Sequence, residues 1–254
     1  MDNTTLSRIV SRFAPNSDGP EHDLLHASLQ SLDCLSDECS WLSERAGAYA
    51  IDIDEFTRSG SGTGCDELGA IFTRYGSDKS TFHDYHKLYA LLLNNNRTAP
   101  LTIVEIGLGT PNTQTMSNMG PLGKPGASLR AFAEYCPNAQ IFGADIDRST
   151  LFREDRIQTA FCDQMALGGF SELNTLIAGK PVDLFIDDGL HVLKANLASL
   201  RYGLTTVPPG GTVVIEDIPD RMAWFWKLVR ATLGQVYTCH LLRCLNGLVF
   251  LCQR

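Results

Sequence analysis

The sequence lacks the hydrophobic segments that direct a chain into or across a membrane. No apolar run reaches the roughly 18 residues that a membrane-spanning helix needs. The first residues, Met1-Asp2-Asn3-Thr4-Thr5, contain neither the basic part nor the apolar part of a secretory signal peptide. We therefore expect a soluble, cytoplasmic protein with no membrane partner.

Runs of basic residues are also missing. The 254 residues include 21 Lys and Arg against 29 Asp and Glu, which gives a formal net charge of −8. No cluster of Lys and Arg forms a stripe that could follow a phosphate backbone, so we expect no nucleic-acid partner. The hydrophobic content of 44% is sufficient for a sizeable core.

The cysteines form neither a disulfide framework nor a zinc cage. Cys34 and Cys39 have the spacing closest to a metal-binding pair, but no second Cys or His pair lies near them in the sequence. Five other cysteines have apolar or mixed sequence neighbours: Cys136, Cys162, Cys239, Cys244 and Cys252. Such neighbours are typical of buried thiols in a reducing compartment. We therefore expect free thiols and no structural zinc.

The organisation of the chain changes near residue 60. Residues 1–65 are predicted to form a helical N-terminal extension and linker, with helical spacing of apolar residues and a connector rich in Gly and Ser at 59–64. The extension could be an appendage for packing and oligomerisation, or a lid over a substrate. We favour the first alternative and expect a homo-oligomer. The sequence contains no internal repeats.

Residues 66–254 are predicted to form one α/β domain. Helical patterns at 66–75, 83–94 and 128–135 are interspersed with apolar strand patterns at 101–106, 140–145, 159–161, 182–186 and 212–215. Strands separated by helix-length connections favour a doubly wound, mostly parallel sheet of the Rossmann-like kind, because right-handed crossovers need that much chain. Ligands of such sheets bind at the carboxyl ends of the strands.

The first two of these strands end in residues suited to a nucleotide-like cofactor. Gly107 and Gly109 follow Glu105, and glycines there let the backbone turn tightly and approach a ligand. Asn112 stands where a dinucleotide-binding fingerprint needs a third glycine, so NAD is not supported. Glu105 fits a cofactor with a cationic centre, and Asp145 can accept hydrogen bonds from both ribose hydroxyls. The alternative, a turn that only packs a helix on a strand, is weakened by Asp145.

Two later strands are followed by paired acids. Asp187 and Asp188 follow one strand, and Glu216 and Asp217 follow the next. Neighbouring carboxylates at the mouth of a sheet repel one another unless a cation or a proton lies between them. This arrangement indicates a site for a divalent metal ion.

Six short blocks follow one another between about residues 70 and 218: YGSDKS at 75–80, VEIGLGT at 104–110, GASLR at 126–130, GADID at 143–147, IDDGLH at 186–191 and GGTVVIED at 210–217. In this order they resemble the class I S-adenosylmethionine-dependent methyltransferases. More narrowly, they are similar to the metal-dependent sugar O-methyltransferases of the macrocin and mycinamicin type. One departure is Pro111, where many class I enzymes carry a third glycine.

The resemblance implies an activity and assigns roles to residues. It implies transfer of a methyl group from S-adenosylmethionine to a hydroxyl, on a sugar of a natural-product glycoside or a nucleotide sugar. Asp188, Glu216 and Asp217 would then hold Mg²⁺ or a similar cation, and His191 would be the general base, with Asp188 beside it in catalysis. Methylation of a non-sugar hydroxyl, or a non-catalytic module that binds cofactor, are the alternatives.

The proposed chemistry also follows from the reactants. A sugar hydroxyl is a poor nucleophile at neutral pH, so methyl transfer needs removal of its proton while its oxygen is aligned with the sulfonium methyl group. His191 follows Asp188 by three residues, close enough to face the same oxygen. A lone histidine is usually structural or exposed, but its place beside the acids favours a catalytic role here.

Five further residues have two interpretations each. Asp163 could bind the adenine amino group of the cofactor or lie exposed in a loop. Asp187 is assigned beside the metal ligands or against the cofactor, because the resemblance gives the metal to Asp188. Lys79 could hold the cofactor carboxylate or an internal loop. For His83 and His86 a packed helix face is favoured over contact with substrate or metal.

Overall fold

The computed structural model describes residues 38, 41–42, 44–45, 49–58 and 64–254. Most of the predicted helical extension, the pair Cys34 and Cys39, and nearly all of the 59–64 connector lie outside the described residues. The predicted helical character of the extension therefore stays a prediction.

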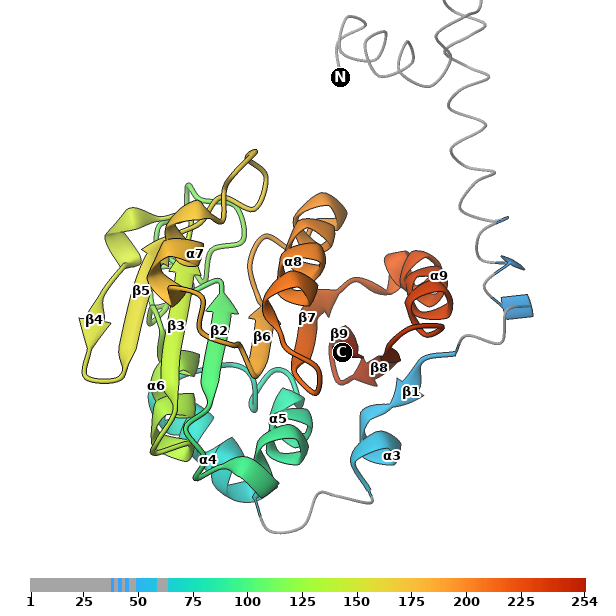
Figure 1. Ribbon diagram of the computed structural model, residues 1–254, viewed down its shortest axis with the longest axis horizontal. Coiled ribbons are helices and arrows are strands. Elements are labelled where there is room, and N and C mark those ends of the chain that lie inside the picture. Colours follow the sequence, from blue (N-terminus) through green and yellow to red (C-terminus); the bar gives the residue numbers. More distant parts are fainter. Residues whose placement is uncertain (1–37, 39–40, 43, 46–48, 59–63) are drawn as a thin grey trace, which may run out of the picture.

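One nine-stranded sheet forms the centre of the described part of the chain, in the order β1-β8-β9-β7-β6-β2-β3-β5-β4 (Figure 1). Five adjacent strands run parallel to one another, in the order β7, β6, β2, β3 and β5. Strand β9 runs antiparallel to both β7 and β8. The predicted mostly parallel sheet is confirmed. The strands are β1 Ile51–Asp52, β2 Thr102–Ile106, β3 Gln140–Asp145, β4 Arg153–Glu154, β5 Ile157–Phe161, β6 Leu184–Asp187, β7 Thr212–Ile218, β8 Thr238–Cys244 and β9 Gly247–Gln253.

Helices cover both faces of the sheet and build two cores. The first core contains apolar residues of α4, α5 and α6, and the second contains those of α7, α8 and α9. Ile103 packs in the first core and its neighbour Val104 in the second, because successive side chains of a strand point to opposite faces. The helices are α3 Ile53–Thr57, α4 Cys65–Tyr75, α5 Tyr85–Leu93, α6 Ala127–Tyr135, α7 Ser171–Ile177, α8 Leu193–Thr206 and α9 Ala223–Leu233.

The predictions for the thiols and for membrane spans can be compared with the described residues. The five cysteines predicted to be buried thiols, Cys136, Cys162, Cys239, Cys244 and Cys252, are buried and free. Within the described ranges no helix combines the length and the apolar character needed to cross a membrane.

Part of the segment assigned to the extension belongs to the main sheet. Ile51 pairs with Leu242 of β8, and Ile53 is only 2% exposed in the first core. Both residues come from the 1–65 segment, so at least this short stretch packs with the central sheet. The reason is local: the last strand pair, β8 and β9, leaves an edge at β8 that β1 covers.

The end of α4 turns the chain toward the carboxyl edge of the sheet. Gly76 has φ 83°, a left-handed conformation that glycine adopts without strain, and its amide donates to the Thr73 carbonyl at 3.1 Å. The amide of Ser77 donates to the Phe72 carbonyl at 2.9 Å. These two bonds end the helix and deliver the 77–84 segment to the site.

β7 is longer than the predicted 212–215 strand and irregular at its end. It continues to Ile218, and its register with β9 shifts between Ile215 and Ile218. Glu216 and Asp217 therefore lie within the strand rather than after it. Asp217 has φ 53°, so the backbone twists sharply between the two acids.

Candidate active site

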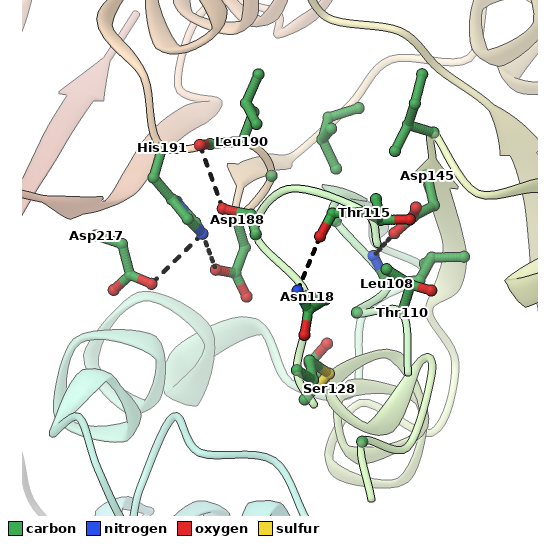
Figure 2. A pocket seen from close by; sticks show the side chains of 18 of the residues that line it. Leu108, Thr110, Thr115, Asn118, Ser128, Asp145, Asp188, Leu190, His191 and Asp217 are labelled. Carbon is green, nitrogen blue, oxygen red and sulfur yellow. Dashed lines mark hydrogen bonds and ion pairs between the residues drawn. The ribbon is translucent and has the colours of Figure 1, made fainter. Parts of the chain in front are cut away.

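A cavity of about 820 Å³ lies at the carboxyl ends of the central strands (Figure 2). Its lining includes the loop after β2, Asp145 at the end of β3, Asp163 after β5, and Asp188, His191 and Asp217. A volume of this order is typical of small-molecule sites. Acids that are far apart in the sequence thus meet around one space, as the predicted sheet requires.

The loop after β2 has the tight turn that its glycines predicted. Gly107 has φ 95°, and a Cβ there would lie 1.9 Å from the Asp188 carbonyl oxygen. Gly109 has φ 78°, and a Cβ there would lie 1.8 Å from the sulfur of Met119. Both positions therefore need glycine, and both line the cavity.

Asp145 fixes this loop from the neighbouring strand. Its Oδ2 accepts a hydrogen bond from the Leu108 amide at 2.8 Å, and its Oδ1 accepts one from the Asp147 amide at 2.8 Å. Burial raises the pKa of Asp145, and the backbone amides oppose that shift. A carboxylate has more lone pairs than these amides use, so Asp145, which lines the cavity, can still accept a hydrogen bond from a ligand.

Replacing Asp145 with Ala is expected to weaken the binding of S-adenosylhomocysteine by about 1.5–3 kcal/mol, because both a charged acceptor and the anchor of the loop are lost. Titration calorimetry measures this directly. Asp155→Ala is the control, since Asp155 is an exposed acid between β4 and β5 and lies outside the cavity lining. Wild-type affinity in Asp145→Ala would remove Asp145 from the cofactor site.

Of the other predicted cofactor contacts, Asp163 lines the cavity and Glu105 does not. Asp163 is half-buried, and its Oδ1 accepts a hydrogen bond from the Met165 amide at 2.9 Å. Glu105 is fully buried within β2, where Ser128 donates to its Oε2 at 2.7 Å. The Glu105 carboxylate thus lies beneath the cavity surface, and its direct contact with the cofactor stays a prediction.

Asp187 also lies beneath the cavity, next to Asp188, and its contact with the cofactor stays a prediction. Its carboxylate accepts hydrogen bonds from Gln164 Nε2 at 2.6 Å and Asn196 Nδ2 at 3.0 Å. Burial raises its pKa, against the effect of these amides. Gln164 in turn accepts a hydrogen bond from the Leu190 amide at 2.9 Å. Asp187 thus holds the loop that carries His191.

Lys79 lies at the centre of a buried acidic cluster. Its ammonium donates to Asp188 Oδ2 at 2.6 Å and to Glu216, and lies 3.1 Å from Glu105 Oε1. Burial alone would lower the pKa of Lys79, but the three carboxylates raise it well above its usual value. In this structure the partners of Lys79 are these three acids, and a contact with the cofactor carboxylate stays a prediction. Its ammonium joins acids from three neighbouring strands.

Replacing Lys79 with Met is expected to destabilise the fold by about 3–5 kcal/mol, because three carboxylates lose their buried cation. Urea unfolding of the full chain measures the change. Lys87→Met is the control, since Lys87 pairs with Asp54 and Asp84 where solvent screens the charges, and we expect less than about 1 kcal/mol there. Equal losses in both variants would contradict the importance of the buried cluster.

His191 lies between two carboxylates at the cavity, as Figure 2 shows. Its Nε2 is 3.9 Å from Asp188 Oδ1 and 3.6 Å from Asp217 Oδ2. His191 has φ 56° and Asp217 has φ 53°, conformations that cost a non-glycine residue about 1–2 kcal/mol. Strain of this kind is concentrated at functional sites, where the surrounding structure holds the side chains in place.

Asp188 and Asp217 form a group that fits a divalent cation. One ligand atom each from Asp188, His191 and Asp217 lie within 4.8 Å of one another, and all three residues line the cavity. Carboxylate oxygens are the donors that Mg²⁺ prefers. Glu216, the third predicted ligand, is buried and does not line the cavity. Its two oxygens accept hydrogen bonds from Lys79 and Tyr89.

His83 is the site residue that the sequence interpretation missed. A packed helix face was favoured for it, but α5 begins only at Tyr85, and His83 lines the cavity with its Nε2 3.5 Å from Asp217 Oδ1. Tyr85 donates to the same oxygen at 2.6 Å. For His86 the predicted packing is confirmed, since its ring lies against Gly69 of α4.

No family model matches the chain. Among curated proteins, it is 28% identical over 166 residues to the 8-demethyl-8-alpha-L-rhamnosyl tetracenomycin-C 2'-O-methyltransferase of Streptomyces olivaceus, covering 65% of this chain and 41% of that one. It is 29% identical over 181 residues to the mycinamicin VI 2''-O-methyltransferase of Micromonospora griseorubida, covering 69% and 42%. The chain thus spans about two fifths of the length of these relatives.

Among solved structures, the chain is similar to the MycE methyltransferase from the mycinamycin biosynthetic pathway, in complex with Mg and SAH. The TM-score is 0.57 at 26% identity, over 73% of this chain and 54% of the other. The chain has the class I methyltransferase fold. The predicted resemblance to methyltransferases of the macrocin and mycinamicin type is confirmed by these relatives.

Proposed function

We propose that this methyltransferase-fold protein transfers a methyl group from S-adenosylmethionine to a hydroxyl of a glycosylated small molecule. The observation that carries the proposal is the position of His191 Nε2. It lies in the cavity between Asp188 and Asp217, farther than a hydrogen bond from either, so a hydroxyl group in the cavity can reach it.

The cofactor half of the proposal is supported by the loop after β2. Gly107, Gly109 and Asp145 line one part of the cavity, and Asp163 lies farther along the same edge. The similar MycE structure contains SAH, and the relatives are named as O-methyltransferases acting at sugar positions. These names favour a sugar hydroxyl over other acceptors for this chain.

The base half of the proposal is supported by how the chain holds His191. Asp187 and Gln164 fix the preceding loop, and the left-handed backbone of His191 directs its ring toward the two acids. In this position the imidazole accepts the hydroxyl proton at Nε2 as the oxygen attacks the methyl group. Histidine suits this task because its ordinary pKa is close to neutral pH.

Asp188 and Asp217 are proposed to hold Mg²⁺ or a similar cation. When bound, such a cation polarises a hydroxyl and fixes its direction. Lys79 donates a hydrogen bond to Oδ2 of Asp188, and Tyr85 donates one to Oδ1 of Asp217. Each acid is thus anchored by one oxygen and offers the other to the cavity.

A screen with the purified full chain tests the function. Rhamnosylated and macrolide glycosides, nucleotide sugars and a catechol are incubated with S-adenosylmethionine and Mg²⁺, and the products are read by mass spectrometry. We expect a gain of one methylene unit on a glycoside. If only the catechol were methylated, the acceptor would be a planar diol rather than a sugar. If no acceptor were methylated, the proposed O-methyltransferase activity would be contradicted.

A further inference from the structure

The segment before α5 places two rings of different character at the edge of the cavity. Phe82 is 58% exposed, His83 is only 6% exposed, and both line the cavity. Phe82 thus offers an apolar surface that a ligand in the cavity can cover.

The rings form an ordered stack. Phe82 lies edge-on to His83, with ring centroids 4.8 Å apart and an interplanar angle of 81°. His83 lies parallel to Tyr85 at 4.5 Å and 15°. Because Tyr85 donates to Asp217, the stack is joined directly to the acids of the candidate active site.

The backbone that carries the rings is held from two sides. The amides of Thr81, Phe82 and His83 all donate to the Asp78 carbonyl, at 3.1, 3.0 and 3.0 Å. From the turn between β8 and β9, Asn246 Nδ2 donates to the Phe82 carbonyl at 2.6 Å. A backbone fixed in this way restricts where the Phe82 ring can lie, which favours the binding of a ligand against it.

His83 has unused hydrogen-bonding capacity. Its Nδ1 is buried and has no partner among the described residues, and its Nε2 is 3.5 Å from Asp217 Oδ1. Because burial closes Nδ1 off from the cavity, Nε2 is the nitrogen of His83 that can reach a ligand beside Asp217. A hydroxyl group, which both donates and accepts, is suited to this position.

We propose that Phe82 and His83 recognise the sugar ring of the acceptor, a proposal that rests on the proposed function. Phe82 packs against the C–H face of the ring, and His83 binds a hydroxyl next to the one that is methylated. The pair therefore sets which hydroxyl faces His191. One apolar ring and one polar group in the same wall match a sugar, which has an apolar face and a polar edge.

Binding to the full chain loaded with S-adenosylhomocysteine tests the proposal without turnover. The probe is 8-demethyl-8-alpha-L-rhamnosyl tetracenomycin C, and the same compound without its rhamnose is the matched control. We expect Phe82→Ala to weaken binding of the glycoside about tenfold and to leave binding of the sugar-free compound unchanged. Phe82→Trp should retain binding of the glycoside, and Val236→Ala, which changes an apolar residue 74% exposed and outside the cavity lining, should have no effect.

His83 is tested by His83→Phe, which keeps the stack but removes the nitrogens, and by His83→Gln, which keeps a polar group. We expect His83→Phe to raise the KM for the glycoside about tenfold with a smaller change in kcat, and His83→Gln to restore part of the loss. S-adenosylhomocysteine affinity, unchanged in every variant, reports an intact fold.

The recognition role would be overturned if the wild type did not bind the glycoside, or if Phe82→Ala and His83→Phe bound it as well as the wild type. It would also be overturned if these variants lost affinity equally for the glycoside and the sugar-free compound, because the rings would then contact the aglycone. Failure of the proposed function looks different. In that case the glycoside binds and depends on Phe82, but no methyl group is transferred when S-adenosylmethionine replaces S-adenosylhomocysteine.

Discussion

Replacing His191 with Ala is expected to lower kcat by about 10²–10⁴-fold, because the His191 imidazole, whose Nε2 lies between Asp188 and Asp217, is the proposed acceptor of the hydroxyl proton. The affinity for S-adenosylhomocysteine should stay at the wild-type value, since the cofactor loop lies on the other part of the cavity. Steady-state kinetics and calorimetry on the same preparations measure both quantities.

The backbone at His191 requires a second variant. With φ 56°, Ala would be strained there, whereas Asn tolerates the left-handed conformation and cannot act as a base. A similar fall in kcat for His191→Ala and His191→Asn assigns the effect to the lost imidazole. His86→Ala is the control, because His86 packs against α4 away from the acids. A nearly normal kcat in His191→Asn would give proton removal to water or to another residue.

Removal of divalent cations is expected to abolish turnover and to leave cofactor binding largely intact. Asp188 and Asp217 supply the oxygen ligands, while Asp145 and the glycine loop do not depend on them. Treatment with EDTA, followed by dialysis and readdition of Mg²⁺, tests this reversibly. Full activity after exhaustive chelation would contradict a metal-dependent reaction.

Two amide variants locate the cation. Asp217→Asn is expected to lose the increase in melting temperature that Mg²⁺ gives to the wild type. For Glu216 the resemblance implies a third ligand, whereas the structure engages both of its oxygens with Lys79 and Tyr89. The structure therefore predicts that Glu216→Gln keeps the response to Mg²⁺. Loss of the response in Glu216→Gln would assign Glu216 to the metal.

The central strands were predictable because their apolar runs are continuous. β3 has the predicted bounds, and β2 and β6 differ from prediction by only a few residues. The pair β8 and β9 was not predicted, although Asn246-Gly247 between two apolar runs is a recognisable hairpin signal. The extension of β7 through Asp217 could not be predicted from the sequence, because it depends on an irregular pairing with β9.

The sequence predicted which strand ends form the site, but not which of their acids line the cavity and which lie beneath it. Sequence places Asp187 and Asp188 side by side, yet only the sheet decides that Asp187 turns under the cavity and Asp188 into it. The link from Lys79 to Asp188 and Glu216 spans 109 and 137 residues, beyond any local pattern. His83 was missed because its helix was predicted to begin two residues too early.

The most direct test of the account follows an isotopically labelled methyl group from S-adenosylmethionine into the product by NMR. With a rhamnosylated acceptor and Mg²⁺, the account predicts a labelled methyl signal bonded to one sugar oxygen in the wild-type reaction, and its near absence with His191→Asn. A labelled methyl group on carbon, nitrogen or an aglycone oxygen, or equal labelling by the two proteins, would contradict it.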